Sequence, residues 1–219
     1  MTLTLYAHPF SSYCQKVLIA LYENATPFNM RMVDFGDERT VAELAALWPL
    51  KRMPVLVDNV QPIGESTIII EHLSLHHPGA VQLIPSDPKG ALQIRFLDRF
   101  FDNYVMTPMQ RIVFNHIRQP QDRDRPTEDD ARALLITAYR WLDTQLDGHE
   151  WAAGDAFTLA DCAAAPSLFY ADWVHPIGEA FPRAQAYRRR LLARPSFARA
   201  VDEARPYRHF FPPGAPDRD

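Results

Sequence analysis

The residues best placed to do chemistry lie in one short segment near the start of the chain, after an alternating apolar run. The segment reads His8-Pro9-Phe10-Ser11-Ser12-Tyr13-Cys14. A reactive dithiol turn has the spacing Cys-x-x-Cys beside a strand and a helix. Here Ser11 stands at the first of these positions and only Cys14 remains at the second. Because a dithiol cycle needs both sulfurs, the chain cannot run one at this turn.

Ser11 can instead stabilise a negative charge on a ligand. At the start of a helix, free backbone N–H groups and the helix dipole favour an anion. The helix end contributes about 0.3–1 kcal/mol, and a hydroxyl that donates to an anion adds roughly 1.5–3 kcal/mol. Lowering the pKa of a bound thiol by about two requires about 2.7 kcal/mol. The position therefore suits a hydroxyl that keeps a bound thiol ionised.

Two alternatives remain open at this turn. Ser11 could act as a nucleophile with His8 as its base, but two residues on an alternating strand and its turn need not face each other. Ser12 could hold the thiol in place of Ser11. Cys14 and Cys162 are expected to be buried core residues, as free cysteines usually are.

The elements that position this turn follow from hydrophobic periodicity. The first part of the chain predicts the order β-α-β-α-β-β-α, with a hairpin around Asp58-Asn59 and Pro62 at a sheet edge or strand end. The expected strands and helices cover 3–7, 14–21, 29–33, 38–47, 55–57, 60–63 and 66–76.

Beyond a proline-rich segment the pattern is helical throughout. We expect one domain at 1–79, a linker at 80–88 and an all-helical domain at 89–219, with a mobile tail at 212–216. Thr158 and Asp161 have the spacing of a capping box. The expected helices cover 89–118 (disturbed at Pro108), 127–146, 158–170 (bent near Pro166), 183–193 and 196–204.

A resemblance to a known family adds to this reading. Phe10-Ser11-Ser12-Tyr13-Cys14 resembles the glutaredoxin turn with serine in place of the reactive cysteine, as in serine-type glutathione S-transferases of the cytosolic kind, including bacterial members. The segments Arg52-Met53-Pro54-Val55-Leu56 and Glu65-Ser66 are similar to that family's segment before the hairpin and to the pair that opens its third helix. The resemblance covers essentially the whole chain and implies a thioredoxin-like domain followed by a helical domain.

The resemblance also implies roles for individual residues. Ser11 would donate to the sulfur of glutathione, with Ser12 as the other candidate. Met53 would offer backbone hydrogen bonds beside a cis-Pro54, and Arg52 would suit the glycine carboxylate. Glu65 and Ser66 would hold the γ-glutamyl ammonium and carboxylate. Trp48 stands where relatives commonly have asparagine.

The implied activity is transfer of the glutathione thiolate, as co-substrate, to an apolar electrophile. Isomerisation of maleylacetoacetate-type substrates, glutathione-dependent disulfide reduction and non-catalytic glutathione binding are the alternatives. Residues expected to line the electrophile pocket are Phe10, Tyr104, Met106, Arg111 and Phe114.

Composition limits the other classes of function. The formal net charge of −4 over 219 residues argues against a nucleic-acid partner. The absence of a long apolar run or a signal-like start predicts a cytoplasmic protein without a membrane partner. His72, His76 and His77 have helical metal-ligand spacing, but no cysteine or well-placed carboxylate accompanies them, so we expect a solvated helix end and no metal. The family resemblance implies a homodimer.

Overall fold

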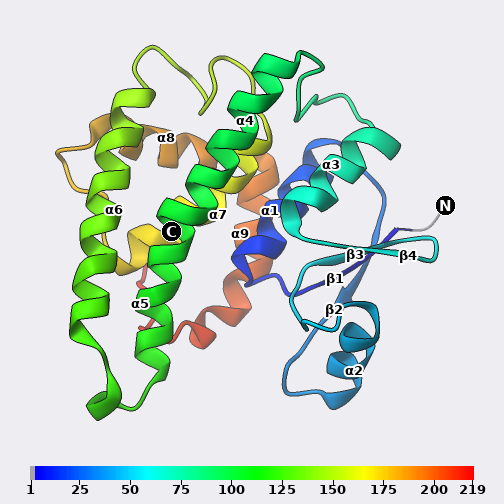
Figure 1. The fold of residues 1–219 in the computed structure, drawn as a ribbon, viewed down its shortest axis with the longest axis horizontal. Helices are drawn as coiled ribbons and strands as arrows, with labels where there is room; N and C mark the ends of the chain where they lie inside the picture. Colours follow the sequence, from blue (N-terminus) through cyan, green and yellow to red (C-terminus); the bar gives the residue numbers. More distant parts are fainter. Residues whose placement is uncertain (1–2) are drawn as a thin grey trace.

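The computed structural model describes residues 3–219 and contains a four-stranded sheet followed by a helical bundle (Figure 1). The strand order is β2-β1-β3-β4. β1 runs parallel to β2 and antiparallel to β3, which pairs antiparallel with β4. The strands are β1 (Leu3–Ala7), β2 (Asn29–Met32), β3 (Val55–Asp58) and β4 (Gln61–Gly64). This is the predicted thioredoxin-like arrangement.

Alternation along β1 explains how the sheet is covered on both faces. Leu3, Leu5 and Ala7 are buried in the main core, whereas Tyr6 packs against a smaller cluster that contains Leu44. Helix α2 (Glu38–Leu47) therefore covers one face, and α1 (Ser12–Glu23) and α3 (Ser66–His76) cover the other. Pro62 pairs with Val57 on the outer strand β4, which confirms the expected edge position.

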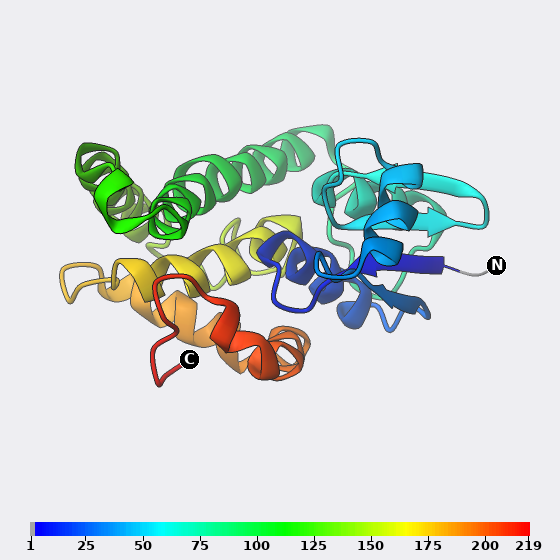
Figure 2. The same ribbon diagram turned by 90° about the horizontal axis from the view of Figure 1, so that it is seen from below.

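The helical part packs around α7, which is buried along almost its whole length. Figure 2 shows this bundle beside the sheet, with α1 at their junction. The bundle consists of α4 (Pro88–Phe100), α5 (Thr107–Ile117), α6 (Arg125–Gln145), α7 (Leu159–Val174), α8 (Pro182–Ala193) and α9 (Pro195–Ala204). Short 3₁₀ turns at Pro120–Asp122 and Arg205–Phe210 connect and extend it.

The helix expected over 89–118 is interrupted, but ahead of Pro108 rather than at it. A π-helical segment, Phe101–Met106, separates α4 from α5. The Thr107 N–H donates to the carbonyl of Asp102, five residues earlier, and the Thr107 hydroxyl donates to the same carbonyl at 2.9 Å. Pro108 has no N–H to donate and would crowd the carbonyl four residues before it. The wider turn ahead of Pro108 avoids that clash.

Two other expectations concern the ends of elements. The capping box of Thr158 and Asp161 is confirmed, since the Thr158 N–H donates to Asp161 Oδ2 at 2.8 Å. The mobility expected of residues 212–216 stays a prediction. Within this tail the Gly214 N–H donates to the Phe211 carbonyl at 2.8 Å, and Ala215 packs against the main core.

Candidate active site

The turn between β1 and α1 presents Ser11 at the N-cap of α1. Its backbone is extended, with φ −82° and ψ 123°, and its side chain makes no capping hydrogen bond. The backbone is held by bonds from the Ser11 N–H to the His8 carbonyl (3.0 Å) and from the Gln15 N–H to the Ser11 carbonyl (2.9 Å). Ser11 lines a cavity of about 420 Å³. Its hydroxyl is therefore placed at a helix N-terminus that opens onto a cavity.

Side chains from the helical bundle fix this turn in place. Gln15 is fully buried, and its amide nitrogen donates to the Pro9 carbonyl at 3.0 Å and to the Tyr170 hydroxyl at 3.1 Å. The Tyr170 hydroxyl in turn donates to the Phe10 carbonyl at 3.1 Å. The position of Ser11 is thus set by α7 as well as by its own helix.

Ser12 and Cys14 have different surroundings from Ser11. Ser12 is the first residue of α1, is 9% exposed and does not belong to the lining of either cavity described here. Burial raises the pKa of the Cys14 thiol to about 11, although Ser11 and the backbone at His8 partly oppose this. Cys162 is also buried, and burial raises the pKa of its thiol. Both cysteines are core residues, as expected.

The imidazole of His8 has its own contacts. Its Nδ1 accepts the Phe10 N–H at 3.1 Å, and its ring lies edge-on to Tyr207 with 4.6 Å between centroids. Burial lowers the pKa of His8. Among residues 3–219 no side-chain hydrogen bond joins His8 to Ser11, so this geometry does not favour a serine–histidine hydrolase.

The opposite wall of the cavity is built from two other turns. The Met53–Pro54 peptide bond is cis, and both residues line the cavity with the exposed Arg52. Glu65 and Ser66 come from the start of α3. Glu65 has φ +67° and ψ 117°, a conformation that costs about 1–3 kcal/mol for a non-glycine residue. The structure thus brings Ser11, Arg52, Met53, Pro54, Glu65 and Ser66 around one cavity.

Several residues at this cavity were missed from sequence. Trp48 and Lys51 come from the turn after α2, and Tyr13, Arg99 and Asp102 complete the interdomain side. The Trp48 Nε1 is buried and has no hydrogen-bond partner among residues 3–219. Burial, followed by the charge of Asp102, raises the pKa of Tyr13 to about 12. Tyr13 is therefore a neutral hydroxyl near pH 7.

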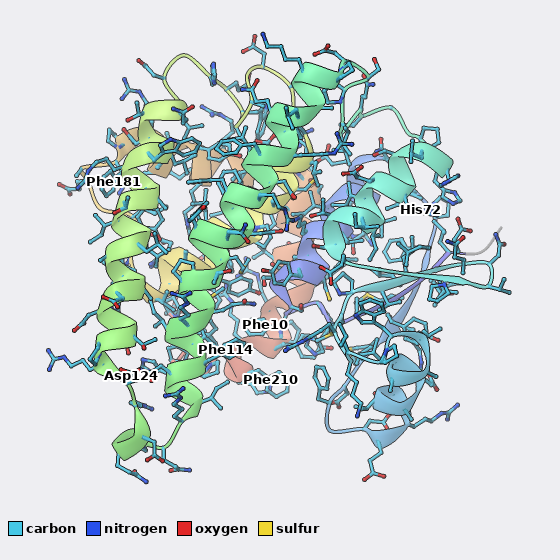
Figure 3. The ribbon with its side chains drawn as sticks, viewed as in Figure 1. Phe10, His72, Phe114, Asp124, Phe181 and Phe210 are labelled. Carbon is cyan, nitrogen blue, oxygen red and sulfur yellow. The ribbon has the colours of Figure 1, made fainter. Side chains whose placement is uncertain are left out.

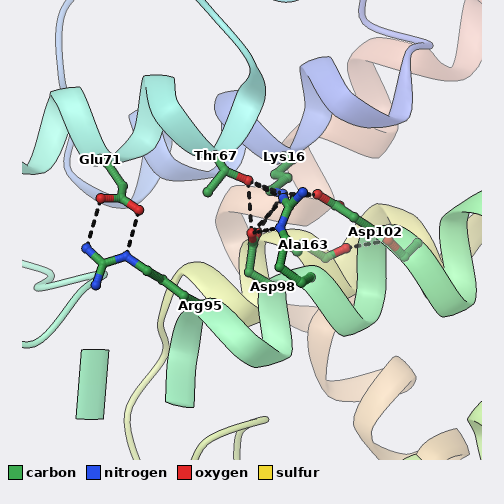
Figure 4. A network of polar contacts seen from close by, with 9 residues as sticks. Lys16, Thr67, Glu71, Arg95, Asp98, Asp102 and Ala163 are labelled. Atoms are coloured by element: carbon green, nitrogen blue, oxygen red, sulfur yellow. Dashed lines mark hydrogen bonds and ion pairs between the residues drawn. The ribbon is translucent and has the colours of Figure 1, made fainter. Parts of the chain in front are cut away.

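A network of buried charges adjoins the side of the cavity that Arg99 and Asp102 line (Figure 4). Lys16 is 1% exposed, and its Nζ lies 2.6 Å from Asp98 Oδ1 and 2.9 Å from Asp102 Oδ2. Thr67 bridges the network, accepting from Lys16 at 3.0 Å and donating to Asp98 at 2.9 Å. Arg99 pairs with both aspartates from the solvent side. Burial raises the pKa of Asp102, and the charge of Lys16 opposes that rise.

A second cavity of about 320 Å³ shares Ser11, Phe35 and Met53 with the first. Its other lining residues are His8, Phe10, Val33, Asp34 and Phe210. Figure 3 shows Phe10, Phe114 and Phe210 at the junction of the two domains. Phe35, Phe114 and Phe210 are 59%, 56% and 57% exposed. Ser11 therefore lies between a charged cavity and an apolar one.

The residues expected to line the electrophile pocket do not all gather there. Phe10 lines the apolar cavity and Phe114 the charged one. Met106 is 1% exposed and belongs to the core of the bundle. Tyr104 and Arg111 are exposed but outside both linings. The π-helical segment explains the difference, because it rotates α5 relative to a continuous helix.

Comparisons with known proteins match both parts of the chain. A family model described as "Glutathione S-transferase, N-terminal domain" matches residues 5–80, and one described as "Glutathione S-transferase, C-terminal domain" matches 105–195. A "Glutathione S-transferase-like protein LUC7" of Fusarium is 30% identical over 158 residues, covering 71% of each chain. A "Probable glutathione S-transferase" of Glycine max is 30% identical over 57% of this chain, which spans 50% of that relative's length.

A solved structure is similar over nearly the whole chain. It is a glutathione S-transferase of Methylobacterium radiotolerans in complex with glutathione sulfonate, with a TM-score of 0.80 and 29% identity. The match covers 92% of this chain and 95% of that one. Within residues 3–219, none of the helices has both the length and the apolar character needed to cross a membrane.

Proposed function

Because this chain belongs to the glutathione S-transferase family, we propose that it is a serine-type member in which Ser11 holds the thiolate of bound glutathione. The observation that carries the proposal is the Ser11 hydroxyl, which is not used as a cap and lines the cavity at the start of α1. Cys14, the other group with the right spacing, is a buried thiol with a raised pKa. Ser12 is 9% exposed and lines neither cavity.

Glutathione would lie along the charged cavity. The backbone of Met53 would pair with the cysteinyl residue, beside the cis-proline. Ser66, at the N-terminus of α3, suits the γ-glutamyl carboxylate, and the exposed Glu65 suits its ammonium group. Asp102 lies on the same cavity and adds negative charge near that ammonium.

The glycine end of glutathione would meet the cations on the other side. Lys51 and Arg52 are both exposed and both line the cavity. These two cations would pair with the glycine carboxylate.

The electrophile would bind in the apolar cavity that shares Ser11. The thiolate sulfur attacks the electrophilic carbon, a C–S bond forms, and the displaced electron pair leaves with the departing group or moves into the substrate. Phe10, Phe35 and Phe210 would contact the apolar part of the substrate. The protein supplies orientation and charge stabilisation, and glutathione supplies the nucleophile.

The test compares Ser11→Ala with Ser12→Ala as the matched control. We expect wild-type protein and Ser12→Ala to show the ultraviolet absorbance of a bound thiolate near pH 7. Ser11→Ala should lose that band and about 10²-fold in turnover of a chloronitrobenzene-type electrophile, while its affinity for glutathione changes less. A thiolate band that persists in Ser11→Ala and disappears in Ser12→Ala would assign the role to Ser12 and overturn the proposal.

The type of reaction is tested separately with the wild-type protein. Turnover of the electrophile above that of disulfide reduction or of maleylacetoacetate-type isomerisation supports transfer. A higher rate in either of the other assays would identify that reaction as the activity of the same site. Binding of glutathione with no turnover in any assay would indicate a binding protein.

We also propose a homodimer, formed through α3 and α4. The Glu71–Arg95 ion pair (2.8 Å) joins these two helices in Figure 4, and both helices also carry exposed apolar residues. They are Ile68 (53% exposed), Leu75 (76%), Leu92 (69%) and Phe96 (55%). An apolar patch rimmed by charge is typical of a protein–protein interface.

A further inference from the structure

A second cluster of chemically active side chains lies where β3 and α3 end. Asp58 is the last residue of β3, and His72 and His77 come from the final turns of α3 and its C-cap. The Nε2 atoms of His72 and His77 lie 3.0 and 2.7 Å from the same oxygen, Asp58 Oδ2. The three side chains are 15%, 17% and 12% exposed, in the order His72, His77, Asp58.

The fold explains why sequence spacing missed this cluster. Helical spacing groups only the histidines of α3, whereas Asp58 lies 14 residues before His72. After the β3–β4 hairpin, α3 runs back over the sheet, so that its C-terminal end reaches the end of β3 (Figure 1). The carboxylate that completes the cluster therefore comes from a neighbouring strand, β3, and not from α3 itself.

Asp58 is oriented by its own turn. Its Oδ1 accepts from the Asn59 side-chain amide at 3.0 Å, which leaves Oδ2 facing the imidazoles. Asn59 has φ +55°, the left-handed conformation that asparagine tolerates in a tight turn. The His77 backbone N–H is bonded to the Leu73 carbonyl at 2.8 Å, which fixes the base of the His77 side chain. The cluster is thus held from both sides.

From these contacts we infer that Asp58, His72 and His77 form a binding site for a divalent transition-metal ion, with Zn²⁺ as the best match. Two imidazole nitrogens and one carboxylate oxygen are ligands that Zn²⁺ accepts, with a fourth position open to water. Ligand atoms bound about 2.0–2.1 Å from a tetrahedral ion lie roughly 3.3 Å apart. The ligand atoms here all lie within 4.8 Å of one another.

The site is separate from the proposed glutathione cavity. Ser66 and His76 are at opposite ends of α3, and a helix of that length spans about 16 Å. Zn²⁺ here would join the end of β3 to the end of α3 without touching Ser11, Glu65 or Ser66. Its effect is on the stability of the thioredoxin-like domain, because an ion that binds only the folded state stabilises it.

The experiment titrates the chelator-treated full chain with Zn²⁺ by calorimetry, without glutathione, whose thiol would compete for the metal. We expect one Zn²⁺ per chain and a rise in Tm on binding. The variants His72→Gln and His77→Gln should each bind at least about tenfold more weakly. The control His149→Gln, which changes an exposed histidine in the loop after α6, should bind as the wild type does. Glutathione affinity, measured after the metal is removed, should be unchanged in all three.

A measurement on the wild type covers the case in which the variants do not fold. The visible spectrum of the Co²⁺ form should show four-coordinate nitrogen and oxygen ligation without thiolate bands, since both cysteines are buried. Three results would each overturn the inference: absence of stoichiometric Zn²⁺ binding, wild-type Zn²⁺ affinity in the His72 and His77 variants, or thiolate bands in the Co²⁺ spectrum.

Discussion

Lys16 is the residue whose surroundings have the largest energetic consequence. It is buried between two aspartates that are themselves almost fully buried. A buried ion pair is weak evidence of net stabilisation, but removing one partner leaves uncompensated charge in the interior. Loss of the Lys16 ammonium would therefore leave the buried carboxylates of Asp98 and Asp102 without their buried counter-charge.

We expect Lys16→Met to lower the free energy of unfolding by about 3–5 kcal/mol, because Asp98 and Asp102 would share only the half-exposed Arg99. Urea denaturation measures the change. Lys16→Arg, which keeps the charge, is the control and should lose much less. A loss below about 1 kcal/mol in Lys16→Met would mean that the aspartates are neutralised in another way.

Residues that act within a local turn could be predicted, and residues brought in by packing could not. Ser11, Glu65 and Ser66 each open a helix, so short motifs identify them. Arg99 and Asp102 lie in an ordinary helical pattern and reach the cavity only because α4 packs beside α1 and α3. The contact between Asp58 and His72 could not be predicted from sequence for the same reason, because it exists only once the β3–β4 hairpin and α3 have both formed and packed.

At the scale of elements, the connection between α5 and α6 depends on a small polar cluster. Asn115 is 4% exposed. Its amide donates to the Asp124 carbonyl at 3.2 Å and to Glu128 at 3.1 Å, and its oxygen accepts the Asp124 N–H at 2.8 Å. Arg132 also donates to Glu128, at 2.7 Å. Glu128 therefore links the end of α5 to the first turns of α6.

Hydrogen bonds from Arg132, and then from Asn115, lower the pKa of Glu128 below its ordinary value. A carboxyl group with a lowered folded-state pKa stabilises the fold above its unfolded pKa, about 4.3. That stabilisation is lost as the pH falls through the lower, folded value. We expect Glu128→Gln to cost about 1 kcal/mol near pH 7.

The same variant should approach the wild type in stability as the pH falls well below 4. Denaturation of both proteins between pH 3 and 8 measures the convergence. Glu150→Gln, at an exposed position in the loop after α6, is the control and should show no such pH-dependent difference. A stability difference between the two proteins that stays constant at all pH values would show that the ionised form of Glu128 does not contribute to stability.

Periodicity predicted the existence and type of the elements better than their continuity. The pattern from Lys89 to Arg118 is helical on either side of residues 101–106, so sequence alone suggests one helix. Only the backbone shows that Pro108 is accommodated by a π-helical segment before it. The π-helical segment also shifts the residues that follow it around the helix axis, so that Phe114 lines the charged cavity and Tyr104 does not.

At the scale of the whole molecule, the proposed dimer can be tested by placing a charge in the apolar patch of α3 and α4. Leu92→Glu should convert the dimer to a monomer in sedimentation analysis at micromolar concentration, since a buried unpaired carboxylate opposes association. Ile117→Glu adds the same charge at a similarly exposed position on α5, 62% against 69% for Leu92. We expect it to leave the dimer intact; equal behaviour of the two variants would contradict the proposed interface.

The burial of α1 has a consequence for how the molecule unfolds. Nine consecutive or near-consecutive residues of this helix are buried, because the sheet packs on one side and α7 and α9 on the other. The main hydrophobic core accordingly contains residues of both domains, from Leu3 to Phe211. We therefore expect the two domains to unfold in one cooperative transition. The two sides of the cavity at Ser11 would then be lost together, on global unfolding.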